Sequence, residues 1–503
     1  MKNLDKEIIN TKKVERLKQK DKKTKKDKLS AKQINSHKKS SRSQVDAEAS
    51  SNQAGPKKLN IGLFCDSFYP MIDGVVSVVN NYAKRLCKIA NVTVFTTSPR
   101  DKNYKDNFPY KVIRCQKFQV PGLDYDLGLP TMDSKFQKEL KDSKLDIVHI
   151  HSPFSVGKAG VIYAKKHKIP SVATNHSQFK LDFFKATNSP ALTQILLNNI
   201  IKVFDACDEN WAVNDMTADL FVDYGLTKRP FVMQNGTDFN PADSKKYKVD
   251  INKKYKILPT DKVLLFVGRM NILKNVPILF DILNILLKHD TSYKLLLVGG
   301  GQDLDDFKKQ VKKMGLSQNV IFAGKVSNQK LLGSIYKRAD LFTFPSLYDT
   351  DGIVKKEAAA FKTPSLVVEK SLTSSNITNN VDGYICKNDA SDIASRILQI
   401  FADKQQYDMV CENCLKNIYK SWDSIIESAY NRYLYLINRK KNQLRAQSKT
   451  KHYQKTIKAV KKQQTETKRN ENKRLQLMKR QMQKYPKTMR ALYKKQRELD
   501  SFN

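Results

Sequence analysis

Long apolar runs are missing from this chain. No stretch of roughly 18 or more residues is continuously apolar, so the sequence predicts no membrane-spanning helix. The N-terminus also lacks the apolar core of a secretion signal. We therefore expect a protein that stays inside the cell.

Cysteine is sparse and shows no paired pattern. The chain has 7 cysteines, and only Cys411 and Cys414 stand in a C-x-x-C arrangement. That arrangement has no second pair and no neighbouring histidine, which argues against a zinc site. No group of His, Cys and carboxylate residues has the spacing of metal ligands, so we expect neither a metal site nor a cofactor. Scattered cysteines suit a reducing compartment.

Negative charge is scarce: 91 Lys and Arg residues stand against 50 Asp and Glu residues, a formal net charge of +41. Residues 1–58 carry 18 basic and 7 acidic residues, and residues 439–503 carry 22 basic and 4 acidic residues. The two ends hold most of the excess positive charge, and the residues between them have the ratio of basic to acidic residues of an ordinary globular protein. We expect residues 1–58 to form a disordered basic tail, because they offer little to bury.

Between these ends, short apolar runs alternate with amphipathic stretches. Strands are expected at residues 60–65, 92–97, 146–150, 171–175, 209–213 and 230–234, and again at 262–267, 294–298, 320–323, 341–344, 365–368 and 383–387. Helical stretches separate several of them, such as 74–89, 189–204, 275–289 and 304–313. The alternation predicts an α/β protein with two Rossmann-like domains, at residues 59–237 and 238–420, facing each other across a cleft.

The last part of the chain is basic and polar, with a weak apolar pattern. Leu475, Met478, Met482 and Tyr485 are spaced by 3, 4 and 3 residues among lysines and arginines. This spacing predicts a basic, partly amphipathic helical tail over residues 439–503, suited to a membrane surface. A solvated helix or a coiled-coil fragment is the alternative.

The most informative stretch is residues 348–359. Asp349 and Glu357 stand eight positions apart, with Gly352 between them and an alanine-rich helix start behind. A glycine turn at a helix start offers free backbone N–H groups to a diphosphate, and a carboxylate accepts hydrogen bonds from sugar hydroxyls. The pattern suits a nucleotide sugar, with a capped surface helix as the alternative.

Two cations follow an expected strand at the start of the second domain. Gly268 ends the strand, Arg269 comes next, and Lys274 follows five positions later. Arginine binds two phosphate oxygens at once, while lysine acts as a point charge, so both suit a diphosphate leaving group. A pair of surface cations is the alternative.

Together these motifs resemble retaining GT-B glycosyltransferases of sequence family four, over about residues 59–438. Asp349 and Glu357 occupy the places of the family's E-x7-E element, with the shorter aspartate first. The resemblance implies metal-independent transfer of a hexose from a nucleotide diphosphate donor, with the α-linkage retained. It also implies that residues 421–438 form a helix that crosses back onto the first domain; a last helix of the second domain is the alternative.

The same resemblance implies the site residues. The implied nucleotide-sugar-binding set is Gly74, Gly299, Gly300, Val326, Gly352, Ile353, Val354 and Glu357. The implied catalytic set is His176, Arg269, Lys274 and Asp349. In these sets Arg269 and Lys274 hold the phosphates. Glu357 holds the ribose hydroxyls, and Asp349 holds those of the donor sugar. Of the neighbouring histidines, His151 is expected to shape the cleft and His149 to be packed.

The N-terminal half resembles bacterial diacylglycerol glucosyltransferases at residues 64–70, 151–157 and 176–179. The implied reaction moves glucose from a UDP-sugar to a membrane lipid such as diacylglycerol. An anionic membrane attracts each nearby Lys or Arg by about 1 kcal/mol, so we expect the basic tails to hold the enzyme on the inner face of the cell membrane.

Two other functions remain open from the sequence. One is a glycosyltransferase of cell-surface polymer synthesis, acting on a teichoic acid, an exopolysaccharide or a protein glycan. The other is a scaffold with a vestigial enzyme fold whose tails bind nucleic acid or another polyanion. The tails have few aromatic residues to stack on bases, so nucleic acid is not the partner we expect.

Overall fold

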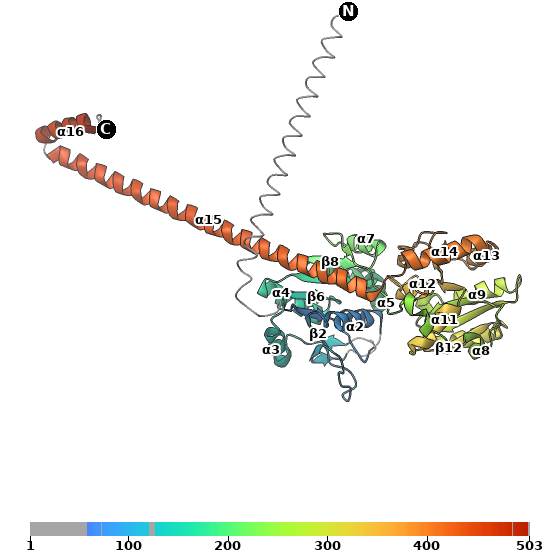
Figure 1. The fold of residues 1–503 in the computed structure, drawn as a ribbon. Helices are drawn as coiled ribbons and strands as arrows, with labels where there is room; N and C mark the ends of the chain where they lie inside the picture. Colours follow the sequence, from blue (N-terminus) through green and yellow to red (C-terminus); the bar gives the residue numbers. More distant parts are fainter. Residues whose placement is uncertain (1–57, 72, 120–125, 485, 501–503) are drawn as a thin grey trace, which may run out of the picture. The chain divides into compact units, whose positions relative to one another are not determined.

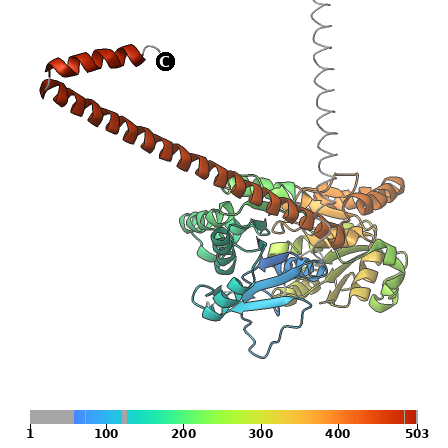
Figure 2. The same cartoon turned by 60° about the vertical axis from the view of Figure 1, so that its left-hand side comes forward.

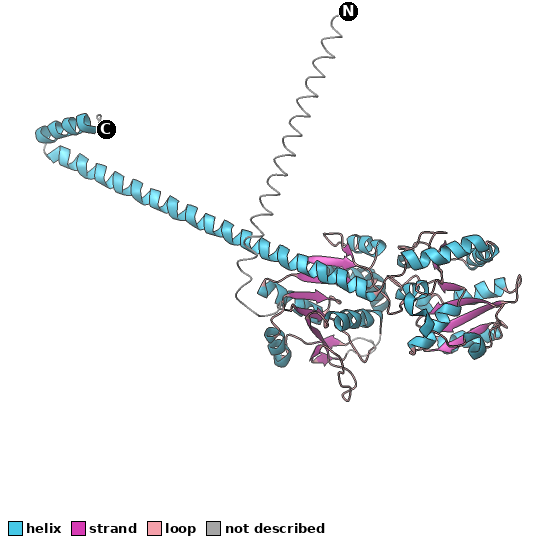
Figure 3. Ribbon diagram, viewed as in Figure 1, coloured by secondary structure: helices cyan, strands magenta, loops and turns pink. Residues whose placement is uncertain are grey.

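The computed structural model describes residues 58–71, 73–119, 126–484 and 486–500. The predicted tail at residues 1–58 lies outside them apart from Lys58, as does Tyr485. Within the described residues, two parallel sheets are each covered by helices on both faces, so the predicted α/β class is confirmed (Figure 3).

The first sheet has seven strands in the order β3-β2-β1-β6-β7-β8-β9, and neighbouring strands run parallel. Its strands are β1 Asn60–Phe64, β2 Asn91–Thr97, β3 Lys111–Cys115, β6 Ile147–Ile150, β7 Ser171–Asn175, β8 Glu209–Ala212 and β9 Phe231–Val232. A short antiparallel pair, β4 Lys117–Phe118 and β5 Leu127–Gly128, lies apart. The helices are α2 Gly74–Leu86, α3 Ser134–Asp142, α4 Ser155–His167, α5 Phe179–Thr187, α6 Pro190–Asp205 and α7 Asp215–Asp223. We call this part the first domain.

The second sheet has six strands in the order β12-β11-β10-β13-β14-β15, again parallel. Its strands are β10 Lys262–Val267, β11 Tyr293–Val298, β12 Val320–Gly324, β13 Leu341–Phe344, β14 Ser365–Val368 and β15 Tyr384–Cys386. Its helices are α8 Ile251–Tyr255, α9 Pro277–Leu286, α10 Leu304–Lys313, α11 Gln329–Arg338, α12 Ile353–Ala359, α13 Ala390–Ala402 and α14 Lys404–Asn417, with 3₁₀ turns η1 Pro241–Lys246, η2 Ile272–Lys274 and η3 Leu372–Ser374. We call this part the second domain.

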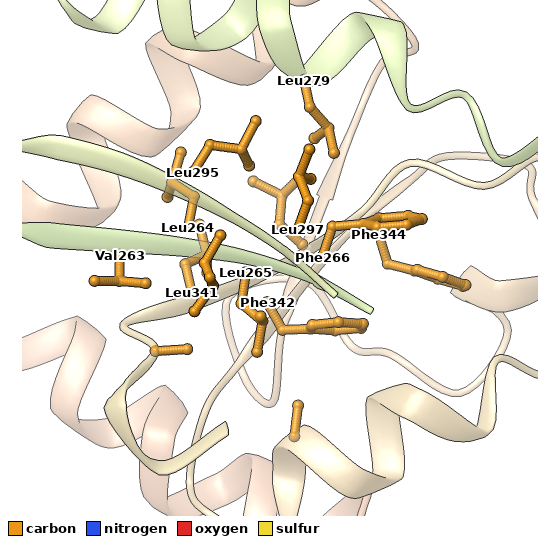
Figure 4. Close-up of a cluster of buried hydrophobic side chains, with 14 of the residues drawn as sticks. Val263, Leu264, Leu265, Phe266, Leu279, Leu295, Leu297, Leu341, Phe342 and Phe344 are labelled. Atoms are coloured by element: carbon orange, nitrogen blue, oxygen red, sulfur yellow. The ribbon is translucent and has the colours of Figure 1, made fainter. Parts of the chain in front are cut away.

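The central strands of both sheets are buried on both faces, as is usual in parallel sheets. Every residue of β13 and β14 is buried, as a strand covered on both faces requires. In the first domain, Ile61 and Leu63 face one core cluster while Phe64 faces another. In the second domain, side chains such as Leu265, Leu297 and Phe342 fill a single core cluster (Figure 4).

In both sheets, successive strands are added first to one side of the domain's first strand and then to its other side, although all strands run parallel. In such sheets, ligands bind at the carboxyl ends of the strands, near the point of reversal. That point lies between β1 and β6 in the first domain and between β10 and β13 in the second. The loops that follow these strands contain the predicted site residues Arg269 and Asp349.

Helix α15 spans Trp422–Lys484, and its first turns belong to the core of the first domain. Trp422, Ile426 and Tyr433 are buried among side chains of β1 and α2. Arg432 makes two hydrogen bonds to the Glu209 carboxylate, at 2.8 and 2.7 Å. After the second domain the chain thus returns to the first domain through the start of α15, and the rest of α15 extends away from both domains (Figures 1 and 2).

Two sequence expectations need correction. The strand β3 was not anticipated, because two of its five residues, Lys111 and Arg114, are charged and it lies at the sheet edge. The helix expected at residues 421–438 does not end there, since α15 continues to Lys484 and α16 spans Pro486–Asp500. Lys, Arg and Gln are good helix formers, and neither Gly nor Pro interrupts residues 439–484. No helix of the described residues is both long and apolar enough to cross a membrane.

The contact between α15 and the first sheet is testable through Tyr433. Its hydroxyl hydrogen-bonds to Nδ1 of the buried His149 at 2.6 Å. Tyr433→Phe leaves that nitrogen unpaired, which should cost about 1–3 kcal/mol and lower the thermal midpoint by several degrees. Tyr435→Phe is the matched control, because Tyr435 is exposed. Equal midpoints for the two variants, measured by thermal unfolding, would contradict the contact.

Candidate active site

The two predicted cations, Arg269 and Lys274, follow the carboxyl end of β10 and have different surroundings. Arg269 is exposed, and its guanidinium has no hydrogen bond or ion pair with any described residue. It lines a cavity of about 430 Å³ that also touches Asp66, Thr97 and Arg114 of the first domain. A cation that faces a cavity without a partner is free to bind an anion.

Lys274 is ion-paired with Asp349. Its ammonium also lies 5.8 Å from the centre of the Tyr348 ring. The second carboxylate oxygen of Asp349 is buried and has no hydrogen-bond partner among the described residues. Buried acceptors are rarely left unpaired, so this oxygen is a place where a ligand hydroxyl fits.

The loop between β13 and α12, residues 345–352, ends at a glycine that the backbone requires. Gly352 has a φ of +64°, and a Cβ there would lie 2.9 Å from the Phe344 ring. It precedes α12, whose first amides, those of Ile353 and Val354, have no acceptor inside the helix. We call residues 347–352 the acidic loop.

Glu357 lies one turn further along α12 and is half buried. The Tyr336 hydroxyl donates a hydrogen bond to its carboxylate at 2.7 Å. Burial raises the pKa of Glu357 to about 7, against the opposing effect of that hydrogen bond. The Glu357 side chain therefore gains or loses its negative charge near neutral pH. In its charged form the carboxylate can accept hydrogen bonds from ligand hydroxyls.

The predicted glycines fall into two kinds. Gly299 has a φ of +142°, and a Cβ there would lie 1.8 Å from the Gly268 carbonyl oxygen, so internal packing alone demands glycine. Gly74 and Gly300 have nothing within 4 Å of a Cβ position, which leaves their backbone open to a ligand. Val326 is half buried against the second-domain core.

Three histidines lie close together at the carboxyl ends of β6 and β7. His149 is buried and uses both ring nitrogens, on Tyr433 at 2.6 Å and on Thr174 at 2.7 Å. Nδ1 of His151 lies 3.1 Å from Nε2 of His176, with the two rings stacked. Burial lowers the pKa of His176 to about 4, so its imidazole is neutral at pH 7. The His176 side chain therefore adds no positive charge to the candidate site.

Two carboxylates near the first domain's loops cap helices. Asp73, beside Gly74, accepts a hydrogen bond from the Val76 amide at 2.7 Å and so caps α2. Asp66 accepts from the Val156 amide at 2.8 Å at the start of α4, and burial raises its pKa. Neither role was anticipated from the sequence. Asp73, an N-cap three residues before the amide that it accepts from, was a readable signal, whereas Asp66 lies 90 positions from Val156 and was not.

A set of contacts that sequence reasoning missed joins the acidic loop to the first domain. The Thr350 hydroxyl donates to the His176 carbonyl at 2.7 Å, and the Asn214 amide donates to the Thr350 carbonyl at 2.7 Å. The Gln178 amide donates to the Tyr348 carbonyl at 2.7 Å. We call these contacts the loop clamp; they bring His176 and the acidic loop together.

The loop clamp is anchored by a buried ion pair. Lys356 donates to both carboxylate oxygens of Asp351, at 2.6 and 2.8 Å, and both side chains are buried. The Asn235 amide adds a hydrogen bond to Asp351 at 2.9 Å. Because the chain is rich in lysine, Lys355 and Lys356 are expected at the surface. The nearby Asp351 is the one feature of the local sequence that could have indicated the ion pair.

The predicted cations and carboxylates thus follow strands β10 and β13 at the carboxyl edge of the second sheet, and Arg269 among them lines the cavity that also touches the first domain. Across the residues that the structure describes, no three His, Cys, Asp or Glu side chains gather as they would around a metal ion. Such a cleft suits a polar ligand with a negatively charged group at its centre and hydroxyls at its ends.

Comparisons with known families agree with this geometry. A model described as Glycosyltransferase Family 4 matches residues 72–240, and one described as Glycosyl transferases group 1 matches residues 248–420. The chain belongs to the GT-B glycosyltransferases that carry these two domains, and it is a glycosyltransferase.

Two of the curated relatives share one name. The chain is 24% identical over 399 residues to the α-monoglucosyldiacylglycerol synthase of Streptococcus pneumoniae, covering 74% of this chain and 88% of that one. It is 26% identical over 322 residues to the enzyme of the same name from Acholeplasma laidlawii, covering 61% and 80%. Among solved structures, Anabaena HepE in complex with UDP matches with a TM-score of 0.60 at 16% identity, covering 74% of this chain and 98% of that one.

The anchoring role of the buried ion pair is testable. Lys356→Met leaves the Asp351 carboxylate buried without its cation, which should destabilise the fold by about 3–5 kcal/mol. Lys362→Met is the matched control, because Lys362 pairs with Glu412 at the surface and should change stability by at most about 1 kcal/mol. Adding Asp351→Asn to Lys356→Met should recover part of the loss. Chemical denaturation measures all three, and equal losses for the two lysine variants would rule out the anchor.

Proposed function

We propose that this glycosyltransferase moves a hexose, with glucose the first candidate, from a UDP-sugar to a membrane lipid such as diacylglycerol, with retention of the α-linkage. The observation that carries the proposal is the grouping of Arg269, Lys274, Asp349 and Glu357 at the carboxyl edge of the second sheet. The relatives named for glucosyldiacylglycerol synthesis support the acceptor.

The donor's diphosphate would lie against Arg269, Lys274 and the first amides of α12. Arg269 is already free, whereas Lys274 must exchange Asp349 for a phosphate oxygen. That exchange would release Asp349 to accept hydroxyls of the donor sugar. Glu357 would accept the two ribose hydroxyls, and the UDP in the HepE complex supports a uridine nucleotide.

The chemical step needs no covalent intermediate on the protein. The bond between the sugar C1 and the β-phosphate oxygen breaks, and its electron pair leaves with UDP. The acceptor oxygen forms the new bond to C1 on the same face, and its proton passes to an oxygen of the leaving phosphate. Arg269 and Lys274 stabilise the charge that develops on UDP, which is commonly the largest contribution to catalysis. They supply positive charge without a divalent metal ion. Neutral His176 would hydrogen-bond the donor sugar near C1.

A lipid acceptor places the enzyme on a membrane. Residues 439–503 carry 22 basic residues against 4 acidic ones, a charge that suits the anionic inner face of the cell membrane. The alternative acceptors, polymer or protein glycans, then become outcomes of the assay.

The test is transfer by the full-length protein from a panel of UDP- and GDP-hexoses, with EDTA present, to vesicles that contain diacylglycerol. We expect a hexosyl-diacylglycerol by mass spectrometry, with an α-anomeric signal by NMR. Arg269→Ala should lower the rate by about 10²–10³-fold, because it removes one charge-stabilising donor. Arg229→Ala is the control, an exposed arginine paired with Asp215 and Asp219. Donor turnover without a lipid product would keep the enzyme and discard the lipid acceptor.

A second test uses the pKa of Glu357. Because the carboxylate accepts the ribose hydroxyls, protonation weakens binding, so affinity for UDP-glucose should rise with pH and level off above about 7. Below that value it should fall by up to about tenfold per pH unit. Calorimetric titrations across pH 5.5–8.5 would follow the affinity, and Glu357→Gln should remove the step. A step that survives in Glu357→Gln would assign it to another group.

A further inference from the structure

The helices α5 and α6 expose apolar side chains that the first domain does not use. They are Leu181 and Phe184 on α5, and Leu192, Ile195 and Leu196 on α6, each between 37 and 56% exposed. The two helices contact each other closely. We call these five residues the hairpin patch.

The hairpin patch is a second apolar face and not the edge of the core. On α5, Phe179 is buried in the core, and on α6, Leu197, Ile200 and Ile201 are buried in the same cluster. The exposed residues are spaced by three on α5 and by three and four on α6, so each set lies on one side of its helix. Both helices therefore have apolar residues on the core side and on the open side.

The exposed charges on α5, and on α6 before its last residue Asp205, are lysines. Lys180 and Lys185 are exposed on α5, and Lys202 is exposed on α6. The one carboxylate within α5, Asp182, is hydrogen-bonded to the Tyr348 hydroxyl. Helix α6 has no acidic residue before Asp205 at its end, where that carboxylate accepts from Thr227. Apolar side chains with a lysine rim complement an anionic lipid surface.

The hairpin patch is also tied to the active site. Helix α5 begins three residues after His176, and Gln178, just before its start, belongs to the loop clamp. Asp182, one turn later, holds Tyr348 of the acidic loop. A surface bound by α5 would therefore lie next to the residues that would receive the acceptor.

We propose that the hairpin patch docks the first domain onto the boundary between headgroups and hydrocarbon of an anionic bilayer, beside the catalytic cleft. This inference rests on the lipid acceptor of the proposed function. A second copy of this chain is a poor occupant, because it would bring lysine rim against lysine rim in a protein of formal charge +41. The patch provides an apolar contact on the first domain in addition to the charge of the basic tail, and stable membrane binding takes two signals.

The two signals respond differently to salt. Attraction between the basic helix and anionic lipid is screened at high ionic strength, whereas burial of apolar side chains is not. The hairpin patch should therefore account for the binding that survives at roughly 0.5 M salt.

A tryptophan reporter tests insertion directly. Both native tryptophans, Trp211 and Trp422, are buried, so an added one dominates the lipid-dependent signal. In Phe184→Trp, emission should shift to the blue with phosphatidylglycerol vesicles and be quenched by brominated acyl chains. Leu258→Trp, at an exposed apolar position of the second domain, is the control and should show neither change. Absence of quenching in Phe184→Trp while the protein sediments with the vesicles would overturn the proposal.

Two double variants test how much the hairpin patch contributes to the affinity for vesicles. Leu192→Gln with Ile195→Gln should weaken vesicle binding at high salt by about tenfold or more, since two apolar side chains no longer leave water. Leu258→Gln with Met409→Gln removes two equally exposed apolar side chains elsewhere and should leave binding unchanged. Calorimetric affinity for UDP should be the same in both double variants, which verifies folding. Unchanged vesicle binding in the hairpin variant would refute the docking surface.

The proposed function can fail independently. If the hairpin variant loses vesicle binding but the native protein yields no glycolipid, the docking surface stands and diacylglycerol is not the acceptor. If a glycolipid forms equally well with the hairpin variant and with the native protein at high salt, the acceptor stands and the docking surface is wrong.

Discussion

The site depends on the buried ion pair between Asp351 and Lys356. Two charges removed from water are tolerated only when each meets its partner with good geometry, and here Lys356 meets both carboxylate oxygens while Asn235 adds a third contact. This requirement fixes the acidic loop on one side and α12 on the other. Because Asn235 comes from the first domain's side of the junction, the same pair helps to set how the two halves of the cleft meet.

From this anchor the rest of the site follows in order. The loop clamp sets Thr350 on the His176 carbonyl, which places the histidine stack beside the loop that carries Asp349. Asp349 in turn pairs with Lys274, so one of the two predicted cations is neutralised by a carboxylate and Arg269 is not. A diphosphate that competes for Lys274 would change the partner of Asp349 in the same event. In the proposed mechanism, one exchange of partners would couple binding of the donor to the release of the Asp349 carboxylate.

Much of this architecture could be predicted because parallel strands are apolar along their whole length. The runs at residues 262–267 and 341–344 were assigned with the bounds of β10 and β13, and the loops after them contain the predicted Arg269 and Asp349. The edge strand β3 escaped because Lys111 and Arg114 break its apolar pattern. The end of α15 was misplaced because the change in composition after Asn438 alters charge and burial, not helix propensity.

The loop clamp and the ion pair could not be predicted for a different reason. The contacts of the loop clamp, and the hydrogen bond that Asn235 adds to the ion pair, join residues more than a hundred positions apart, such as Asn214 with Thr350 and Asn235 with Asp351. Nothing in the local sequence of Lys356 separates a buried lysine from the many exposed ones in this chain. The hairpin patch was missed similarly, since apolar residues on α6 read as core until their exposure is known.

The central claim is that Arg269 and Lys274 bind the donor through its diphosphate. The most direct measurement is calorimetric binding of UDP and of uridine to the native protein and to Arg269→Ala with Lys274→Ala. The account predicts that UDP binds far more tightly than uridine to the native protein and that the difference collapses in the double variant. An undiminished difference in that variant would place the diphosphate elsewhere and contradict the account.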